Sequence, residues 1–285
     1  MREKKGSLTY QVKQIFDSRL RIGESRHEAK LSGEDKDGIY SWNTYKTYLK
    51  HSAYFVKWCK AEHGCKTVEE CRQYADEWLE SRFDLSAWTL KTEVSALAKL
   101  YGDAASDYIE TPSRHREDIT RSRGEALRDA HFSEEKNRFF VDFCRSTGLR
   151  RSEVACLTGN QLLIRDNKPY IYVHKGTKGG KIRYAPIVAE KGLEAEIVAK
   201  MQECGESKVF DHIPNGADVH SFRADYATAL YKLCERDFDT VKKSGDIYYC
   251  RRDRAGTWFD KQAMQITSEA LGHSRIDIIA GHYIR

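Results

Sequence analysis

A basic stretch without an apolar face, residues 111–128, divides this chain of 285 residues and limits the folds open to it. It reads TPSRHREDITRSRGEALR and interleaves five arginines with only three acids. Such a composition buries too little apolar surface to join a packed core. We therefore expect a helical domain at 1–112, a basic linker at 113–130 and a second domain at 131–285.

Helical periodicity dominates the chain before the linker. The stretch 41–59 places apolar residues at helical spacing behind a Ser41 cap. Thr67 and Glu70 form a capping-box pattern for another helix, and a third apolar stripe runs to a stop at Gly102. These patterns predict an all-α bundle of four or five helices.

After the linker the pattern changes. The stretch SEEKNRFFVDFCRSTG predicts an amphipathic helix capped by Ser133 and ended by Gly148. Three strand candidates follow, QLLIR, PYIYVH and KIRYAPIV, separated by the turn DNK and the loop KGTKGG. From about Gly192 we expect helices again, interrupted at KKSGDIYYCRRDRAG. The predicted fold class is mainly α with a small three-stranded antiparallel sheet, an α+β fold.

Charge and hydropathy limit the kinds of partner that the chain can bind. Lys plus Arg exceed Asp plus Glu by only 48 to 43, so an anionic partner has to be met by local clusters. The beginning of the chain, MREKKGSLTYQ, lacks the apolar region of a signal peptide, and no run of eighteen apolar residues occurs. We expect a soluble, cytoplasmic protein without membrane contact.

The cysteines do not suggest a metal centre. Eight are scattered without a Cys-x-x-Cys pair, and we expect them to be buried small hydrophobic residues. One cluster, Cys59, His63, Cys65 and Cys71, has spacings unlike those of zinc sites. We expect no bound metal.

The motif TGLRRSE contains the first candidate for chemistry. A sharp helix end at Gly148 holds Arg150 at the start of the next element, and Glu153 lies one turn later to orient it. The alternative is an ordinary surface pair of Arg and Glu.

Lys178 is the second candidate, in the glycine-bearing loop between two predicted strands. It is either a solvated hairpin tip or a lysine on a mobile arm that donates a proton to a substrate. The pattern of a phosphate-binding P-loop is absent, so nucleotide hydrolysis is not indicated.

Two further motifs carry histidines. In HSFR, His220 and Arg223 are three residues apart and share one face of a helix. In LGHSRIDIIAGHYIR, His273 follows a helix end at Gly272, and Tyr283 comes ten residues later. That last stretch is either a frayed tail or a segment that presents Tyr283 as a nucleophile.

Taken in order, these motifs resemble the tyrosine recombinase, or phage integrase, family. The resemblance rests on TGLRRSE, KGGKIRYAPI, HSFR and the LGHS to Tyr283 segment. It implies a tyrosine-recombinase catalytic domain in the second half. The helical first half is similar to the family's core-binding domain in size, placement and pattern.

The resemblance also selects the lysine. In the family this lysine stands eight residues before the proline that ends the next strand, and Lys178 with Pro186 satisfies that spacing where Lys175 does not. The interval from His273 to Tyr283 is one residue longer than the commonest family form, which allows an unusual shape for the tyrosine segment.

The resemblance implies a role for each residue. Arg150, supported by Glu153, and Arg223 would hold the non-bridging phosphate oxygens, and His273 would add a hydrogen bond. His220 would assist removal of the phenol proton. Tyr283 would form a 3′-phosphotyrosyl bond while Lys178 protonates the departing 5′ oxygen, with no cofactor. A nucleophile used in only half of the protomers is expected on a movable segment.

The implied partners are double-stranded DNA recombination sites, held by a homotetramer on two duplexes, with an accessory directionality factor as a further candidate. The expected linker contacts to phosphates come from Arg114, Arg116, Arg121 and Arg123. We expect no arm-type DNA-binding module before Leu8. Integration or excision of a mobile element is preferred over resolution of chromosome dimers, and the protein would be nucleoid-associated when bound to DNA.

Three alternatives stay open at this point. A type IB topoisomerase-like strand transferase has a similar set of residues but relaxes supercoils as a monomer. A non-catalytic DNA-binding protein would form no covalent adduct. A metal-dependent transposase would need a carboxylate trio, for which we find no convincing pattern.

Overall fold

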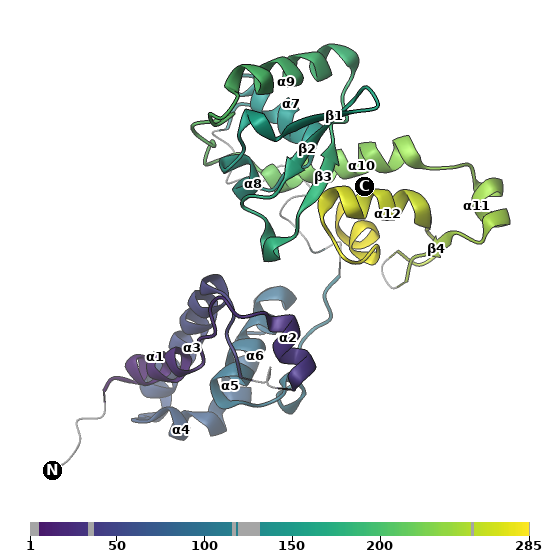
Figure 1. Ribbon diagram of the computed structural model, residues 1–285. Coiled ribbons are helices and arrows are strands. Elements are labelled where there is room, and N and C mark those ends of the chain that lie inside the picture. Colours follow the sequence, from purple (N-terminus) through teal and green to yellow (C-terminus); the bar gives the residue numbers. More distant parts are fainter. Residues whose placement is uncertain (1–5, 34–36, 116–117, 119–131, 252–253, 285) are drawn as a thin grey trace. The chain divides into compact units, whose positions relative to one another are not determined.

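The computed structural model describes residues 6–33, 37–115, 118, 132–251 and 254–284 (Figure 1). The chain forms two compact units, Met1–Arg114 and His115–Arg285. Each unit has its own apolar core. In the part of the chain that the structure describes, no helix is both long enough and apolar enough to cross a membrane.

The first unit is all-helical, as predicted, but its described residues form six α-helices and not four or five, because the stretch after Thr67 is divided into two short helices. Its α-helices are α1 (Leu8–Ser18), α2 (Arg26–Ser32), α3 (Trp42–His63), α4 (Val68–Cys71), α5 (Ala75–Glu80) and α6 (Ala87–Tyr101). The Ser41 hydroxyl accepts a hydrogen bond from the Thr44 amide at 3.1 Å and caps α3. Gly102 ends α6 with a φ of 76°, a left-handed conformation that favours glycine. Helix α3 packs against α1 and α6 around a core that includes Phe55 and Trp78.

The second unit combines helices with a small sheet. Its helices are α7 (Arg138–Thr147), α8 (Arg151–Ala155), α9 (Lys191–Cys204), α10 (Val219–Cys234), α11 (Phe238–Ser244), α12 (Lys261–Leu271) and the π-helical turn η8 (Ile279–Tyr283). Helix α10 packs against both α7 and α12. It therefore links the two apolar clusters of this unit.

The predicted three-stranded antiparallel sheet is confirmed. Strands β1 (Leu162–Arg165), β2 (Lys168–Val173) and β3 (Arg183–Pro186) lie in the order β1-β2-β3. The turn between β1 and β2 has positive φ at both central residues, Asp166 and Asn167 (50° and 56°), as a tight hairpin requires. The pairing of Val173 with Arg183 sets the register of β2 and β3.

The structure corrects several expectations. Helix α7 begins at Arg138 and not directly after Ser133, because the Ser133 hydroxyl caps a separate turn by accepting from the Lys136 amide at 3.2 Å. The interruption between α11 and α12 contains a second antiparallel sheet, β4 (Ile247–Tyr249) with β5 (Trp258–Asp260), which we did not predict. The cysteines are not uniformly buried, since Cys156 is exposed and both Cys204 and Cys234 are half-buried.

Gly148 brings the end of α7 against α10. It ends α7 with a φ of 59°, and a Cβ at this position would overlap the ring of Tyr226. That ring is fully buried, and its hydroxyl donates to the Pro186 carbonyl at 2.9 Å. The ring therefore has little freedom to move aside.

Replacement of this glycine tests the close approach. We expect Gly148→Ala to lower the free energy of unfolding by about 2–4 kcal/mol, because left-handed strain and overlap with Tyr226 add together. Gly245→Ala is the matched control, since Gly245 ends α11 at a φ of 73° with nothing within 4 Å of its added Cβ. Urea unfolding of the full chain measures both. Equal losses in the two variants would contradict the close approach.

Candidate active site

Arg150 stands at the N-terminus of α8, directly after the sharp helix end at Gly148. Its side chain is 21% exposed, and its Nη1 donates to Glu153 Oε1 at 2.8 Å. Its backbone amide donates to Glu153 Oε2 at 2.7 Å. The expected contact between Arg150 and Glu153 is therefore present, and one carboxylate fixes both the backbone and the side chain of Arg150.

Glu153 also holds a second arginine, which the sequence reasoning missed. Arg183 Nη1 and Nη2 donate to Oε1 and Oε2 of Glu153, both at 2.7 Å, and both side chains are almost fully buried. Burial alone would raise the pKa of Glu153. The hydrogen bonds and charge of Arg183, with those of Arg150, outweigh burial and lower this pKa to about 2. The carboxylate is therefore ionised at neutral pH.

Arg183 connects Glu153 to α12. Its Nε donates to the Ala270 carbonyl at 2.7 Å, and its Cδ would lie 3.0 Å from a Cβ added to Gly272. The sequence does contain a signal for this role. Strand alternation assigns Arg183 and Ala185 to the same face of β3, and both are buried while Tyr184 is exposed. A charged residue at an inward strand position indicates a buried ion pair.

Arg223 lies deeper than Arg150, on α10, and is 1% exposed. Its Nη1 donates to the Gly148 carbonyl and its Nη2 to the Leu271 carbonyl. Burial, with the charges of Arg150 and Arg183, outweighs the opposing effect of Tyr283 and lowers the pKa of Arg223 to about 10. The guanidinium therefore remains charged at neutral pH.

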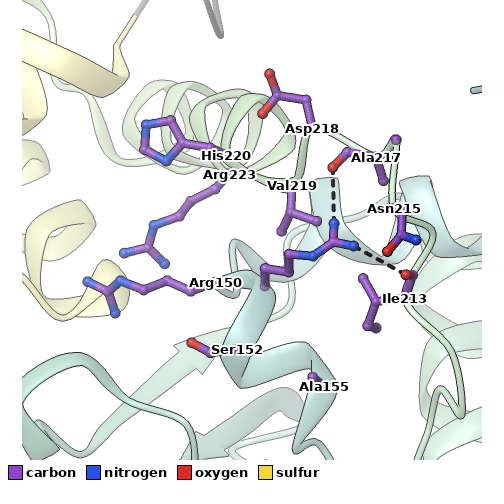
Figure 2. Close-up of a pocket in the computed structure, with 12 residues that line it drawn as sticks. Arg150, Ser152, Ala155, Ile213, Asn215, Ala217, Asp218, Val219, His220 and Arg223 are labelled. Atoms are coloured by element: carbon purple, nitrogen blue, oxygen red, sulfur yellow. Dashed lines mark hydrogen bonds between the residues drawn. The ribbon is translucent and has the colours of Figure 1, made fainter. Parts of the chain in front are cut away.

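Arg150, Arg223 and His220 line one pocket of about 1120 Å³. Figure 2 shows the side chains of Arg150 and Arg223 extending to the same side of this pocket from two different elements. His220 is exposed on α10, one turn before Arg223. Two guanidinium groups and an imidazole facing one opening are suited to an anion with several oxygens.

Arg151, a second arginine that the sequence analysis did not single out, lines the pocket and binds the segment before α10. Arg151 donates to the carbonyls of Ile213 (3.2 Å), Pro214 (2.8 Å) and Ala217 (3.3 Å), and dashed lines in Figure 2 mark the bonds to Ile213 and Ala217. It therefore fixes the segment that leads into α10 and so into His220. Nothing in the spacing of TGLRRSE distinguishes this role from that of a surface arginine.

Tyr283 lies within the site and not on a frayed tail. It is 5% exposed, and its hydroxyl accepts a hydrogen bond from Arg223 Nε at 3.4 Å. Its ring centroid is 5.5 Å from that of His220 and 5.2 Å from that of His273. The segment that was expected to be movable is docked in this structure, with Ile279, Ala280 and Ile284 also buried.

The segment before Tyr283 has an unusual backbone. Ile279–Tyr283 is a π-helical turn, closed by the Ile284 amide donating to the Ile279 carbonyl at 3.0 Å. A π turn accommodates one residue more than an α turn and is frequent at functional sites. This conformation is consistent with the extra residue between His273 and Tyr283.

His273 follows the C-terminus of α12, where Gly272 has a φ of 72°. Its Nε2 lies 3.4 Å from Arg223 Nη2. Burial, together with the charges of Arg223, Arg150, Arg183 and Lys181, lowers the pKa of His273 to about 4. The imidazole is therefore neutral at pH 7, and its Nε2 can accept from Arg223.

Lys178 is exposed, in a loop that is anchored to the site at two points. On one side the Ser152 hydroxyl donates to the Gly176 carbonyl at 2.8 Å. On the other side Lys181 Nζ donates to the His273 carbonyl at 2.8 Å. Lys178 itself makes no hydrogen bond or ion pair with another described residue. The loop that carries Lys178 is thus tied to Ser152 of α8 on one side and to His273 on the other.

The linker arginines are described only in part. Arg114 is exposed at the end of the first unit. The other three expected DNA contacts, Arg116, Arg121 and Arg123, lie outside the described residues. Among the residues that the structure does describe, no group of three His, Cys, Asp or Glu side chains could hold a metal ion.

Comparison of the backbone with solved structures identifies the fold. A XerH site-specific recombinase bound to a palindromic difH substrate, in a post-cleavage complex, matches with a TM-score of 0.52 and 15% identity over 98% of this chain and 94% of its own. The same recombinase in a pre-cleavage complex gives a TM-score of 0.51 and 15% identity over 96% of this chain and 91% of its own. The chain has the tyrosine-recombinase fold. No protein-family model and no curated protein matches it in sequence.

The tyrosine-recombinase fold therefore persists here at low sequence identity. It brings together motifs that are more than 130 residues apart, from Arg150 to Tyr283. The six residues predicted from their order in the sequence lie on α8, the loop before β3, α10, the loop after α12 and the π turn. Five of them contact one another or line one pocket, and Lys178 lies on the neighbouring loop whose residues Gly176 and Lys181 bond to Ser152 and His273.

The environment of His273 yields a pH prediction. We expect the imidazole of the free protein to titrate in NMR spectra with a midpoint below pH 5, because burial and four cations disfavour the charged form. Saturating sulfate, which stays dianionic over this range, should raise the midpoint, since an anion in the pocket favours imidazolium. Arg150→Met should also raise it by removing one cation. A midpoint above pH 6 in the free protein, or a downward shift with sulfate, would contradict this electrostatic environment.

Proposed function

We propose that this chain is a tyrosine site-specific recombinase that cleaves and rejoins DNA through a 3′-phosphotyrosyl intermediate. The observation that carries the proposal is the hydrogen bond that Arg223 Nε donates to the Tyr283 hydroxyl at 3.4 Å, because Arg223 also lines a pocket together with Arg150. The phenol can act as a nucleophile on a phosphodiester, and the two guanidinium groups can neutralise the charge of its phosphate. The tyrosine-recombinase fold of the chain supports the same assignment.

The arginines would stabilise charge in the transition state. Arg150 and Arg223 bind the two non-bridging oxygens of the scissile phosphate, because fixed guanidinium groups need little reorganisation as negative charge develops. His273 adds a hydrogen bond to the same phosphate. The imidazole is neutral in the free protein, and a bound phosphate would raise the pKa of His273 because its negative charge favours the imidazolium form.

Two proton transfers accompany cleavage. The Tyr283 oxygen attacks phosphorus, the bond from phosphorus to the 5′ oxygen breaks, and the tyrosine becomes linked to the 3′ phosphate. His220, whose ring contacts that of Tyr283, assists removal of the phenol proton. Lys178 gives a proton to the departing 5′ oxygen, leaving a 5′ hydroxyl.

The reverse reaction reseals DNA. A 5′ hydroxyl from a partner strand attacks the phosphotyrosyl bond, the proton returns to Tyr283, and the phosphodiester is restored. The adduct retains the energy of the broken bond, so the exchange needs neither ATP nor another cofactor. Exchange between two duplexes then requires four protomers that each supply one tyrosine.

DNA binding would use both units. The XerH structures are of a recombinase bound to its difH substrate, and we propose double-stranded recombination sites as the substrate here. The exposed Arg114 and the other linker arginines would contact phosphates, which predicts affinity that falls steeply with salt. The proposed biological role is integration or excision of a mobile element, with a directionality factor as an accessory partner.

Loss of the nucleophile tests the reaction. Tyr283→Phe should bind a recombination-site duplex with unchanged affinity but form no covalent protein–DNA adduct on a nicked suicide substrate, as seen on a denaturing gel. His282→Ala is the neighbouring control and should retain the adduct. If the adduct persists in Tyr283→Phe, another residue is the nucleophile.

The leaving group tests Lys178. We expect Lys178→Ala to slow cleavage by about 10²–10⁴-fold, the usual contribution of a general acid. A substrate with sulfur in place of the bridging 5′ oxygen should restore most of the rate, because a thiolate leaves without a proton. Lys175→Ala, in the same exposed loop, should cleave the oxygen substrate at the normal rate. Failure of sulfur to rescue Lys178→Ala would exclude the general-acid role.

A further inference from the structure

The hairpin of β4 and β5 lies between α11 and α12 and has no part in the chemistry described above. Near the turn of this hairpin, Arg254 reaches the C-terminal segment of the chain. Its Nη1 donates to the Ala280 carbonyl at 2.7 Å and to the Ile284 carbonyl at 3.1 Å. These two carbonyls lie on either side of Tyr283 in the sequence. A single guanidinium therefore spans the turn that carries the phenol.

The Arg254 side chain is held in place by its own hairpin. Its guanidinium carbon lies 4.9 Å from the ring centroid of Phe259 on β5, a cation–π contact. The Thr257 amide donates to the Arg254 carbonyl at 3.0 Å, and the Cys250 amide donates to the Thr257 carbonyl at 2.9 Å. Arg254 is half-buried as a result. Its reach toward the C-terminal segment is thus defined by backbone and ring contacts.

The base of the hairpin is fixed to the body of the second unit. Arg236, just after α10, donates to Asp260 Oδ1 at 2.6 Å and to Asp246 Oδ2 at 3.0 Å. Asp260 is fully buried and also accepts from the Gln262 amide at 2.9 Å, which caps α12. The hairpin is therefore anchored on α10 and α12, the same helices that carry Arg223 and precede His273.

A cation at the C-terminal end of the π turn stabilises it. Carbonyls in the last turn of a helix have no donor within the helix, and a positive charge at that end is favourable. The Thr228 hydroxyl also contacts the backbone of this segment, donating to the Tyr283 carbonyl at 3.4 Å. The Arg254 bonds are shorter and carry charge, so they are the stronger of these contacts.

We propose that Arg254 is a positioning residue that holds the π turn in place and so keeps Tyr283 docked against Arg223. This inference rests on the proposed function, because it assigns Arg254 a role only if Tyr283 is the nucleophile. Attack in line with the leaving oxygen tolerates little error in the position of the phenol. A displacement of about 1 Å can cost about 100-fold in rate.

Single-turnover cleavage of a suicide substrate at saturating DNA tests the role. We expect Arg254→Ala to form the adduct about 10- to 100-fold more slowly than the wild type, with the same half-saturating DNA concentration. Arg251→Ala is the matched control. It removes one positive charge from the same hairpin, but its exposed side chain makes no hydrogen bond or ion pair with a described residue. It should cleave at the wild-type rate.

A conservative variant separates positioning from a general loss of structure. Arg254→Lys can still donate to both carbonyls but cannot stack flat on Phe259, so its rate should fall between those of Arg254→Ala and the wild type. Thermal melting of each variant identifies a loss of folding. If Arg254→Ala does not fold, Arg254→Lys carries the comparison, and a rate below that of Arg251→Ala supports the proposal.

The outcomes that overturn the inference differ from those that overturn the function. If the wild type forms the adduct and Arg254→Ala forms it at the same rate, the positioning role is excluded. If Arg254→Ala does not fold, the same conclusion follows from a wild-type rate in Arg254→Lys. Equal slowing by Arg251→Ala, with weaker DNA binding in both variants, would make the hairpin a DNA contact and also exclude it. Absence of any adduct in the wild type would instead refute the proposed function itself.

Discussion

The site depends on the ion pairs that the buried carboxylate of Glu153 forms with Arg183 and Arg150. The carboxylate accepts hydrogen bonds from Arg183 at both oxygens and from the backbone and side chain of Arg150. Without it, two guanidinium groups would face each other in a buried region, and Arg223 already repels both. Removing one partner of a buried pair typically costs about 3–5 kcal/mol, because the remaining charge stays unpaired. Glu153 compensates only part of the positive charge of these three arginines, and the proposed phosphate would bind to the excess.

Around this carboxylate, the fold collects groups from distant parts of the chain. Arg183 ties Glu153 to the Ala270 carbonyl at the end of α12, just before His273. Arg223 bonds to the carbonyls of Gly148 and Leu271, so the ends of α7 and α12 meet on α10. The same arginine contacts Tyr283. The proposed chemistry at phosphorus therefore depends on the packing of the ends of α7 and α12 against α10.

Local signals in the sequence were sufficient where the physics is local. A serine cap at Ser41 and glycine stops at Gly102 and Gly148 predicted helix ends, because capping and left-handed φ depend on a few neighbouring residues. The order of motifs likewise indicated that Arg150, Arg223 and Tyr283 belong together. Elements stabilised by distant contacts were missed. Strands β4 and β5 have three residues each, too few for a recognisable alternation.

The charged residues show the same limit. Arg151, Arg183 and Arg254 bind backbone carbonyls or a buried carboxylate from other elements, yet in the sequence they are three arginines among many. Of these, Arg183 alone had a signal, its inward position on β3. The docking of Tyr283 against Arg223 could not be predicted either, because it requires the π turn and its contacts with the hairpin and α10.

The account is tested most directly by trapping the covalent complex on a suicide duplex, digesting the protein and identifying the DNA-linked peptide by mass spectrometry. We predict that the nucleotide is attached through its 3′ phosphate to the oxygen of Tyr283. Attachment to any other residue, or linkage to a 5′ phosphate, would contradict the account.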